Sequence, residues 1–135
     1  HNGHIAKTNT SLYNCLGKRL ADALGDEYFS IGTDARVTVF NSQTAEGFKE
    51  TTVQNENDLN ALAAGVEGLC YYIDLEKASA YEGWSELLQG KQRITSLNVG
   101  GLTFLKMFYT AKIVPEDTFD GMILFDQTEP TTMEL

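Results

Sequence analysis

Apolar residues in the first part of the chain repeat at a helical interval. Leucines recur at every fourth residue from Leu12 to Leu24, which places them on one face of a helix. Thr10 or Ser11 can cap the start of this helix through a hydroxyl group, and Gly25 can adopt the left-handed backbone that often ends a helix. The pattern therefore predicts an amphipathic helix with clear boundaries.

Short runs of aromatic and β-branched residues after this helix predict strands. Residues 28–33 form the first run, and residues 37–40 and 48–53 are weaker candidates. The polar residues 41–47 separate the two weaker candidates, which is typical of a hairpin.

Two later runs are apolar on both alternating faces. They cover residues 69–73 and 121–125, and a strand of this kind is usually covered by helices on both sides. We expect residues 69–73 to form a central strand of the sheet.

Helical patterns lie between these strands. Residues 58–66 predict a helix capped by Asn57 or Asp58, and residues 79–88 predict another that Gly90 ends. Shorter features complete the pattern: a strand over residues 93–99, a break at Gly100 and Gly101, an ambiguous apolar segment over residues 102–109, and a turn at residues 115–117. Helices that alternate with buried strands favour a layered α/β fold. We predict a single domain over residues 1–135, with a mixed sheet flanked by helices.

Composition narrows the function classes. The 135 residues carry a formal net charge of −9, so phosphate backbones and anionic lipid surfaces would repel the chain. We therefore expect neither nucleic acid nor membrane as a partner. No apolar stretch approaches the roughly 20 residues of a membrane span, so we expect a soluble protein, with the cytoplasm favoured as its compartment. Cys15 and Cys70 lie far apart among apolar neighbours and are expected to be buried free thiols.

The two histidines of the chain, His1 and His4, lie three positions apart around Asn2 and Gly3. Imidazole exchanges protons near neutral pH, and a neutral ring can donate a hydrogen bond to a developing oxyanion. Two alternatives stay open at this stage. The histidines could be exposed side chains on a turn without a role, or metal ligands, although two ligands are too few for zinc.

Asp34 is a second candidate. It follows the predicted strand over residues 28–33, and ligands of open α/β sheets gather at strand ends. The alternative is a surface ion pair between Asp34 and Arg36.

Several segments together resemble the second half of the erythromycin esterase family. They are His1-Asn2-Gly3-His4-Ile5-Ala6-Lys7, the Tyr28-Phe29-Ser30-Ile31-Gly32 strand, the run over residues 69–75 that ends in Asp-Leu, and the run over residues 119–125 with the Thr128-Glu129-Pro130 tail. The resemblance covers most of the chain, and the His-Asn-x-His and Tyr-x-x-Ile-Gly patterns are its specific parts.

This resemblance implies a two-part α/β hydrolase without a serine nucleophile, in which a histidine and acidic groups activate water to open a macrolide lactone. By the resemblance, His1 and His4 are active-site histidines, and we assign Asn2 and Asp34 to substrate binding. Resistance of bacteria to macrolide antibiotics is a narrower implication. No cofactor is expected.

The chain begins at His1 without a preceding helix or strand, so we expect an internal start within a longer protein. The resemblance places the general-base histidine and its glutamate in a first half upstream of His1, so we expect the chain alone to be inactive. Its partners would be the ester or lactone substrate, the missing N-terminal half and, through an unpaired strand edge, a second copy of the chain in a homodimer. Two rival functions remain: a binding or assembly module related to surface polysaccharide, and a metal-dependent hydrolase with His1 and His4 as ligands.

Overall fold

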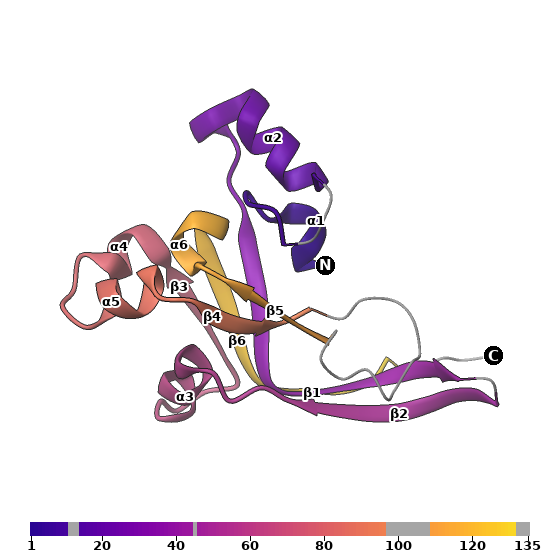
Figure 1. Ribbon diagram of the computed structural model, residues 1–135. Coiled ribbons are helices and arrows are strands. Elements are labelled where there is room, and N and C mark those ends of the chain that lie inside the picture. The colour runs from indigo at the N-terminus through magenta and orange to yellow at the C-terminus, as the bar shows by residue number, and fades with distance from the viewer. Residues whose placement is uncertain (11–13, 45, 97–108, 132–135) are drawn as a thin grey trace.

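A four-stranded mixed sheet organises the fold, and helices flank it (Figure 1). The computed structural model describes residues 1–10, 14–44, 46–96 and 109–131. The elements in chain order are α1 (Asn2–Ile5), α2 (Leu16–Leu24), the 3₁₀ turn η1 (Gly25–Glu27), β1 (Ile31–Thr44), β2 (Gly47–Gln54), α3 (Asp58–Ala64), β3 (Cys70–Asp74), α4 (Leu75–Ser79), α5 (Trp84–Gln89), β4 (Gln92–Thr95), β5 (Thr110–Ile113), α6 (Pro115–Thr118) and β6 (Gly121–Thr128). The predicted fold class is confirmed.

The sheet has the strand order β2-β1-β6-β3, and β4 and β5 form a separate antiparallel pair. β1 and β6 run parallel, whereas β2 and β3 pair antiparallel with their neighbours. The apolar run over residues 121–125 is a strand, as its pattern predicts; it lies between β1 and β3, a central position that was expected for residues 69–73, and it extends to Thr128.

β1 joins two strands that the sequence predicts separately. It continues from Ile31 to Thr44 through residues 34–36, because these residues pair with β6 or lie in register with it. The predicted hairpin is confirmed, but its turn is shorter than residues 41–47 since β1 and β2 pair as far as Thr44 and Gly47. Figure 1 shows this hairpin as a long arm that extends beyond the rest of the sheet.

β3 corrects the expectation of a central strand over residues 69–73. It is the outer strand beside β6, and Cys70 and Tyr72 are exposed on it. A pattern with apolar residues on both faces indicates surface that can be covered, but it does not identify the neighbour that covers it. The prediction of a buried thiol is confirmed for Cys15 and wrong for Cys70.

Two helical predictions and one turn prediction are also corrected. α2 begins at Leu16, after Cys15, and the proposed cap at Ser11 and the leucine at position 12 lie outside the described residues. The single helix over residues 79–88 is two helices, α4 and α5, separated around Gly83 at a φ of 85°. The turn at residues 115–117 is the one-turn helix α6, which begins with proline, and β5 was not predicted.

α3 matches its prediction closely. Asn57 caps it by accepting the N–H of Asn60, and the helix ends at Ala64. β4 covers the start of the strand predicted over residues 93–99 and ends at Thr95, while residues 97–99, the glycine pair and residues 102–108 lie outside the described residues. Within the described part of the chain, no helix is long and apolar enough to cross a bilayer.

The core lies on one face of β6. Met122 and Leu124 are fully buried there and alternate along the strand, as a half-covered strand requires. The buried side chains that join them in one cluster are Ala6 and Cys15 from the segment between α1 and α2, and Leu59, Leu75, Leu88, Ile94, Ile113 and Phe119 from α3, α4, α5, β4, β5 and the residue after α6.

Gly17 sets how closely α2 approaches the start of the chain. A Cβ atom at this position would lie 2.3 Å from the carbonyl carbon and oxygen of Ile5, a distance that requires a backbone shift. The absent side chain therefore lets α2 pack directly against the end of α1.

We expect Gly17→Ala to lower the free energy of unfolding by about 1–3 kcal/mol, because overpacking against backbone cannot be relieved by a rotamer change. The matched control is Gly65→Ala at the end of α3, where φ is −80° and a Cβ atom would make ordinary contact at 3.4 Å. Urea denaturation of both variants measures the difference. Equal stabilities for the two variants would contradict the close approach of α2 to α1.

Candidate functional site

The two histidines lie together at the ends of α1. His1 is the N-cap of this short helix, and its Nδ1 accepts the N–H of Gly3 at 3.0 Å. The His1 and His4 ring centroids lie 4.4 Å apart with their planes tilted by 35°. The structure thus brings both predicted histidines into one pair, with both side chains partly open to solvent.

Asn2 attaches this pair to the sheet. β2 pairs with β1 only from Val37 onward. Among the described strands, residues 31–36 of β1 therefore have no partner on the side where β2 pairs further along. Asn2 binds there as a neighbouring strand would: its Nδ2 donates to the Thr33 carbonyl at 2.5 Å, and its Oδ1 accepts the Thr33 N–H at 2.9 Å. The Asn2 side chain is buried, and both of its polar ends are engaged with the protein.

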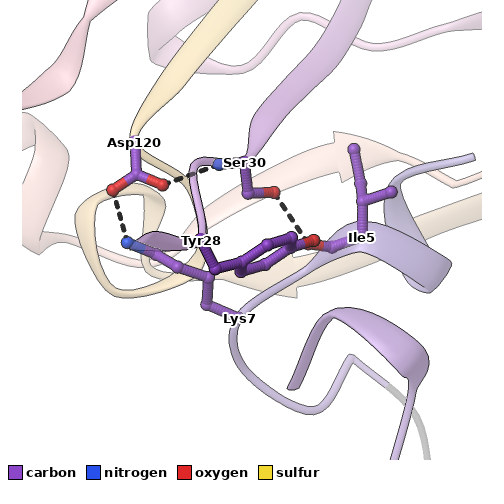
Figure 2. Close-up of polar contacts among 5 residues, drawn as sticks. All are labelled: Ile5, Lys7, Tyr28, Ser30 and Asp120. Atoms are coloured by element: carbon purple, nitrogen blue, oxygen red, sulfur yellow. Dashed lines mark hydrogen bonds and ion pairs between the residues drawn. The ribbon is translucent and has the colours of Figure 1, made fainter. Parts of the chain in front are cut away.

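A second set of contacts fixes the other end of the same segment (Figure 2). The Ile5 carbonyl accepts hydrogen bonds from the Tyr28 hydroxyl and the Ser30 hydroxyl, each at 2.7 Å. Lys7 pairs with Asp120 at 2.6 Å, and Asp120 also accepts the Ser30 N–H. Residues 1–7, here called the histidine segment, are therefore fixed to β1 and to the residue before β6.

The histidine segment borders a cavity of about 500 Å³. His1, Asn2 and Asp34, three of the four predicted site residues, lie in its wall, while His4 contacts His1 from outside the lining. The other lining residues are Thr33, Ala35, Thr38, Val39, Phe40, Asn41, Phe48, Thr95, Phe125, Thr128, Glu129, Pro130 and Thr131. Because Thr33 and Phe40 are seven residues apart on one strand, the cavity extends roughly 20 Å along β1 toward the hairpin.

Asp34 is buried and surrounded by amide groups. Asn55, Asn57 and Asn60, here called the asparagine cluster, donate through Nδ2 to its carboxylate at 2.7–3.3 Å. The backbone N–H of Thr95 on β4 adds a donor at 2.9 Å. Both carboxylate oxygens therefore accept hydrogen bonds from within the protein.

The surface ion pair between Asp34 and Arg36 does not form. Asp34 is only 3% exposed, and Arg36 instead pairs with Asp126 at 2.7 Å. Successive strand residues point to opposite faces of a sheet, so neighbours separated by two positions share a face but need not meet. Here Arg36 pairs across to the adjacent strand β6, where Asp126 lies in register.

The sequence did not reveal Thr95 or the asparagine cluster as parts of this site. A signal was present, because three asparagines occur within six residues across the start of a predicted helix. Only one of them is needed as a helix cap, and the other two had no assigned role.

Within the described residues, no group of three or more His, Cys, Asp or Glu side chains is placed to hold a metal ion. The polar side chains that line the cavity carry imidazole, carboxamide, hydroxyl and carboxylate groups.

Comparison with known proteins gives one family and two similar structures. The profile of the family described as erythromycin esterase matches residues 1–128. The crystal structure of a protein from Bacillus cereus superposes with a TM-score of 0.80 at 25% identity, over 100% of this chain and 34% of that chain. The crystal structure of a succinoglycan biosynthesis protein superposes with a TM-score of 0.79 at 21% identity, over 99% of this chain and 33% of that chain, and supports the fold alone. The chain thus spans about a third of each solved structure, and curated proteins give no significant match.

The Arg36–Asp126 pair yields a pH prediction. The hydrogen bond from Arg36 lowers the pKa of Asp126, which burial alone would raise. A lowered carboxyl pKa in the folded state adds stability above the unfolded pKa of about 3.9, and this contribution is lost as pH falls through the folded pKa. We expect Arg36→Gln to raise the titration midpoint of Asp126, as measured by carboxyl ¹³C shifts.

Lys18→Gln is the matched control, since it breaks a Lys18–Asp22 pair on α2 and leaves Asp126 untouched. Identical Asp126 midpoints in the wild type and in Arg36→Gln would show that the two strands are not joined by this pair.

Proposed function

The chain belongs to the erythromycin esterase family, and from that premise we propose that its histidine segment supplies part of a site where water hydrolyses a carboxylic ester or lactone. The observation that carries the proposal is the cavity in which His1 lies beside Asn2 and Asp34. Small-molecule sites are usually concave and largely apolar, with a few convergent polar groups. A macrolide lactone is the substrate that the family name suggests, and action on an antibiotic is the narrower form of the proposal.

We assign His1 to hydrogen-bond donation. Its Nδ1 accepts the Gly3 N–H, so the proton of the neutral ring is on Nε2. An Nε2–H group directed at the carbonyl oxygen of the substrate would stabilise the tetrahedral intermediate. A ring in this tautomer has no free nitrogen with which to take a proton from water, so the general base is a different group.

The proposed reaction is ordinary ester hydrolysis by water. The water oxygen bonds to the carbonyl carbon while a general base takes one water proton, and His1 donates to the oxyanion that forms. The bond to the leaving alcohol breaks as the intermediate collapses, and the alcohol oxygen takes up a proton. By the family resemblance, the base is a histidine with a glutamate partner outside this chain, and we assign His4, next to His1, to positioning the water.

We further propose that the rest of a longer protein covers the outer face of α2. Leu16 and Leu24 on this helix are 61% and 45% exposed, and Phe29 beyond it is 61% exposed. Such an apolar surface usually marks an interaction site. The length of the two solved structures, about three times that of this chain, supports a covering partner within the same protein.

The activity test compares the chain with the longer protein that contains it, using macrolide and simple aryl esters. We expect hydrolysis by the longer protein and none by the chain alone. His1→Ala should lower kcat by about 10²–10³, as the loss of an oxyanion donor does, whereas His1→Gln should retain part of the rate through its amide N–H. The matched control is Asn9→Ala, an exposed position next to the histidine segment.

Three outcomes would overturn the assignment. Turnover by the chain alone that is lost in His4→Ala would show that the catalytic groups are placed wrongly. Absence of hydrolysis across the ester panel, together with tight binding of a glycan, would favour a binding module, and activity that chelation abolishes would favour a metal-dependent hydrolase.

The covering partner is tested by stability at Leu16. We expect Leu16→Gln to change the free energy of unfolding of the chain alone by no more than about 0.5 kcal/mol, because the side chain is exposed there. In the longer protein the same variant should cost about 1.5–3 kcal/mol, as for an apolar side chain that is buried. Lys18→Gln on the same helix is the control.

Equal effects of Leu16→Gln in both forms would contradict a partner within the same protein. The alternative is that a second copy of the chain covers α2. Sedimentation of the chain alone at increasing concentration tests it, because a mass that doubles would identify a second copy as the partner.

A further inference from the structure

We infer that Asp34 is a positioning residue for His1, acting through Thr95 and Asn2. The inference deepens the proposed function and rests on it where catalysis is concerned, but its structural part concerns the His1 ring alone. It gives Asp34 a role different from direct contact with substrate.

The Asp34 carboxylate is buried and has no cation partner among the described residues. It is 3% exposed, and none of the ion pairs in the described part of the chain includes it. A buried carboxylate without a cation requires hydrogen bonds to both oxygens. The backbone N–H groups of Ala35 and Thr95 serve Oδ1, and the amides of Asn57 and Asn60 serve Oδ2, with Asn55 close to both.

The asparagine donors to Asp34 also hold β4 in place. The Nδ2 atoms of Asn55 and Asn57 also donate to the Arg93 carbonyl, at 2.9 and 2.7 Å. Arg93 and Thr95 both belong to β4, so the carboxylate and the asparagine cluster together fix β4 against β1. Amides that are shared between a charged acceptor and a backbone carbonyl have little freedom to rotate.

Asn2 links this arrangement to His1. Asn2 is bound by Thr33, which directly precedes Asp34, and its Nδ2 also lies 3.4 Å from the Thr95 carbonyl. Asn2 is therefore held by the backbone of Thr33 and the carbonyl of Thr95, and Asp34 fixes the distance between these two groups. His1 directly precedes Asn2 in the chain. A change at Asp34 should reach the His1 ring without any direct contact between the two side chains.

Asp34→Asn removes the charge and keeps the shape, but it turns one acceptor into a donor. That donor then faces either the amides of Asn57 and Asn60 or the backbone N–H groups of Ala35 and Thr95. Asn57→Ser is the milder second variant. Serine preserves the cap of α3 because its hydroxyl accepts a backbone N–H as asparagine does, while the amide that donates to both Asp34 and the Arg93 carbonyl is lost. Asp22→Asn on the exposed side of α2 is the matched control for the change of charge.

The experiment records the ring ¹⁵N shifts of histidine in the 135-residue chain, where His4→Gln assigns the two rings. We expect the wild type and Asp22→Asn to show one neutral tautomer for His1, with the proton on Nε2. Asp34→Asn and Asn57→Ser should show averaged shifts from a mixture of tautomers, because the Gly3 N–H no longer holds Nδ1. If Asp34→Asn fails to fold, Asn57→Ser decides the result.

A kinetic arm separates positioning from general stability. In the form that hydrolyses the ester, Asp34→Asn should lower kcat by about 10- to 100-fold, as a small misplacement of a catalytic group does, with KM within about twofold. In a His1→Ala background the same substitution should have almost no further effect on kcat, because interacting residues are not additive.

His1 shifts that stay unchanged in a folded Asp34→Asn or Asn57→Ser chain would overturn the inference, as would an equal loss of kcat with and without His1. If the wild type hydrolyses no ester, the proposed function fails while the ring spectra still decide the positioning role.

Discussion

The histidine pair depends on the hydrogen bonds that the Asn2 carboxamide makes to the backbone of Thr33. A carboxamide carries a donor and an acceptor at the spacing of a peptide group, so it can occupy the open edge of β1 where no strand of the described chain pairs. This contact explains why a polar side chain is buried between two exposed histidines. It also fixes the sequence spacing, since His1 and His4 can meet only if α1 begins at the point where Asn2 is held.

The surrounding structure supports that contact from two directions. On one side, Lys7, Asp120 and the hydroxyl groups of Tyr28 and Ser30 fix the end of the histidine segment (Figure 2). On the other, the buried carboxylate of Asp34 holds β4 beside β1. Neither set of contacts is stabilised mainly by burial of apolar surface. Both include hydrogen bonds to charged groups, which are stronger than those between neutral groups. The apolar core on β6 supplies the rigid support on which these polar contacts rest.

Local patterns in the sequence predicted many of the helices and strands of this fold, but they did not predict the contacts between residues far apart in the chain. Periodicity found α2, α3 and β6 because helix and strand patterns reflect burial within one segment. It placed the outer strand β3 at the centre of the sheet, since a pattern of burial does not reveal which segment provides the cover. The role of Asn2 depends on partners 31 and 93 positions away, and that of Asp34 on a backbone group 61 positions away. The histidines were found because imidazole is chemically distinctive. Asparagine is common in turns, and among the three near α3 the sequence predicted only the capping role of Asn57.

The most direct test of the account is a crystal structure of the longer protein with a phosphonate analogue of the tetrahedral intermediate of ester hydrolysis. The account predicts that Nε2 of His1 lies about 2.7–3.1 Å from a phosphonate oxygen within the cavity, while Nδ1 still accepts the Gly3 N–H. A phosphonate bound elsewhere, or a His1 ring that points away from it into solvent, would contradict the account.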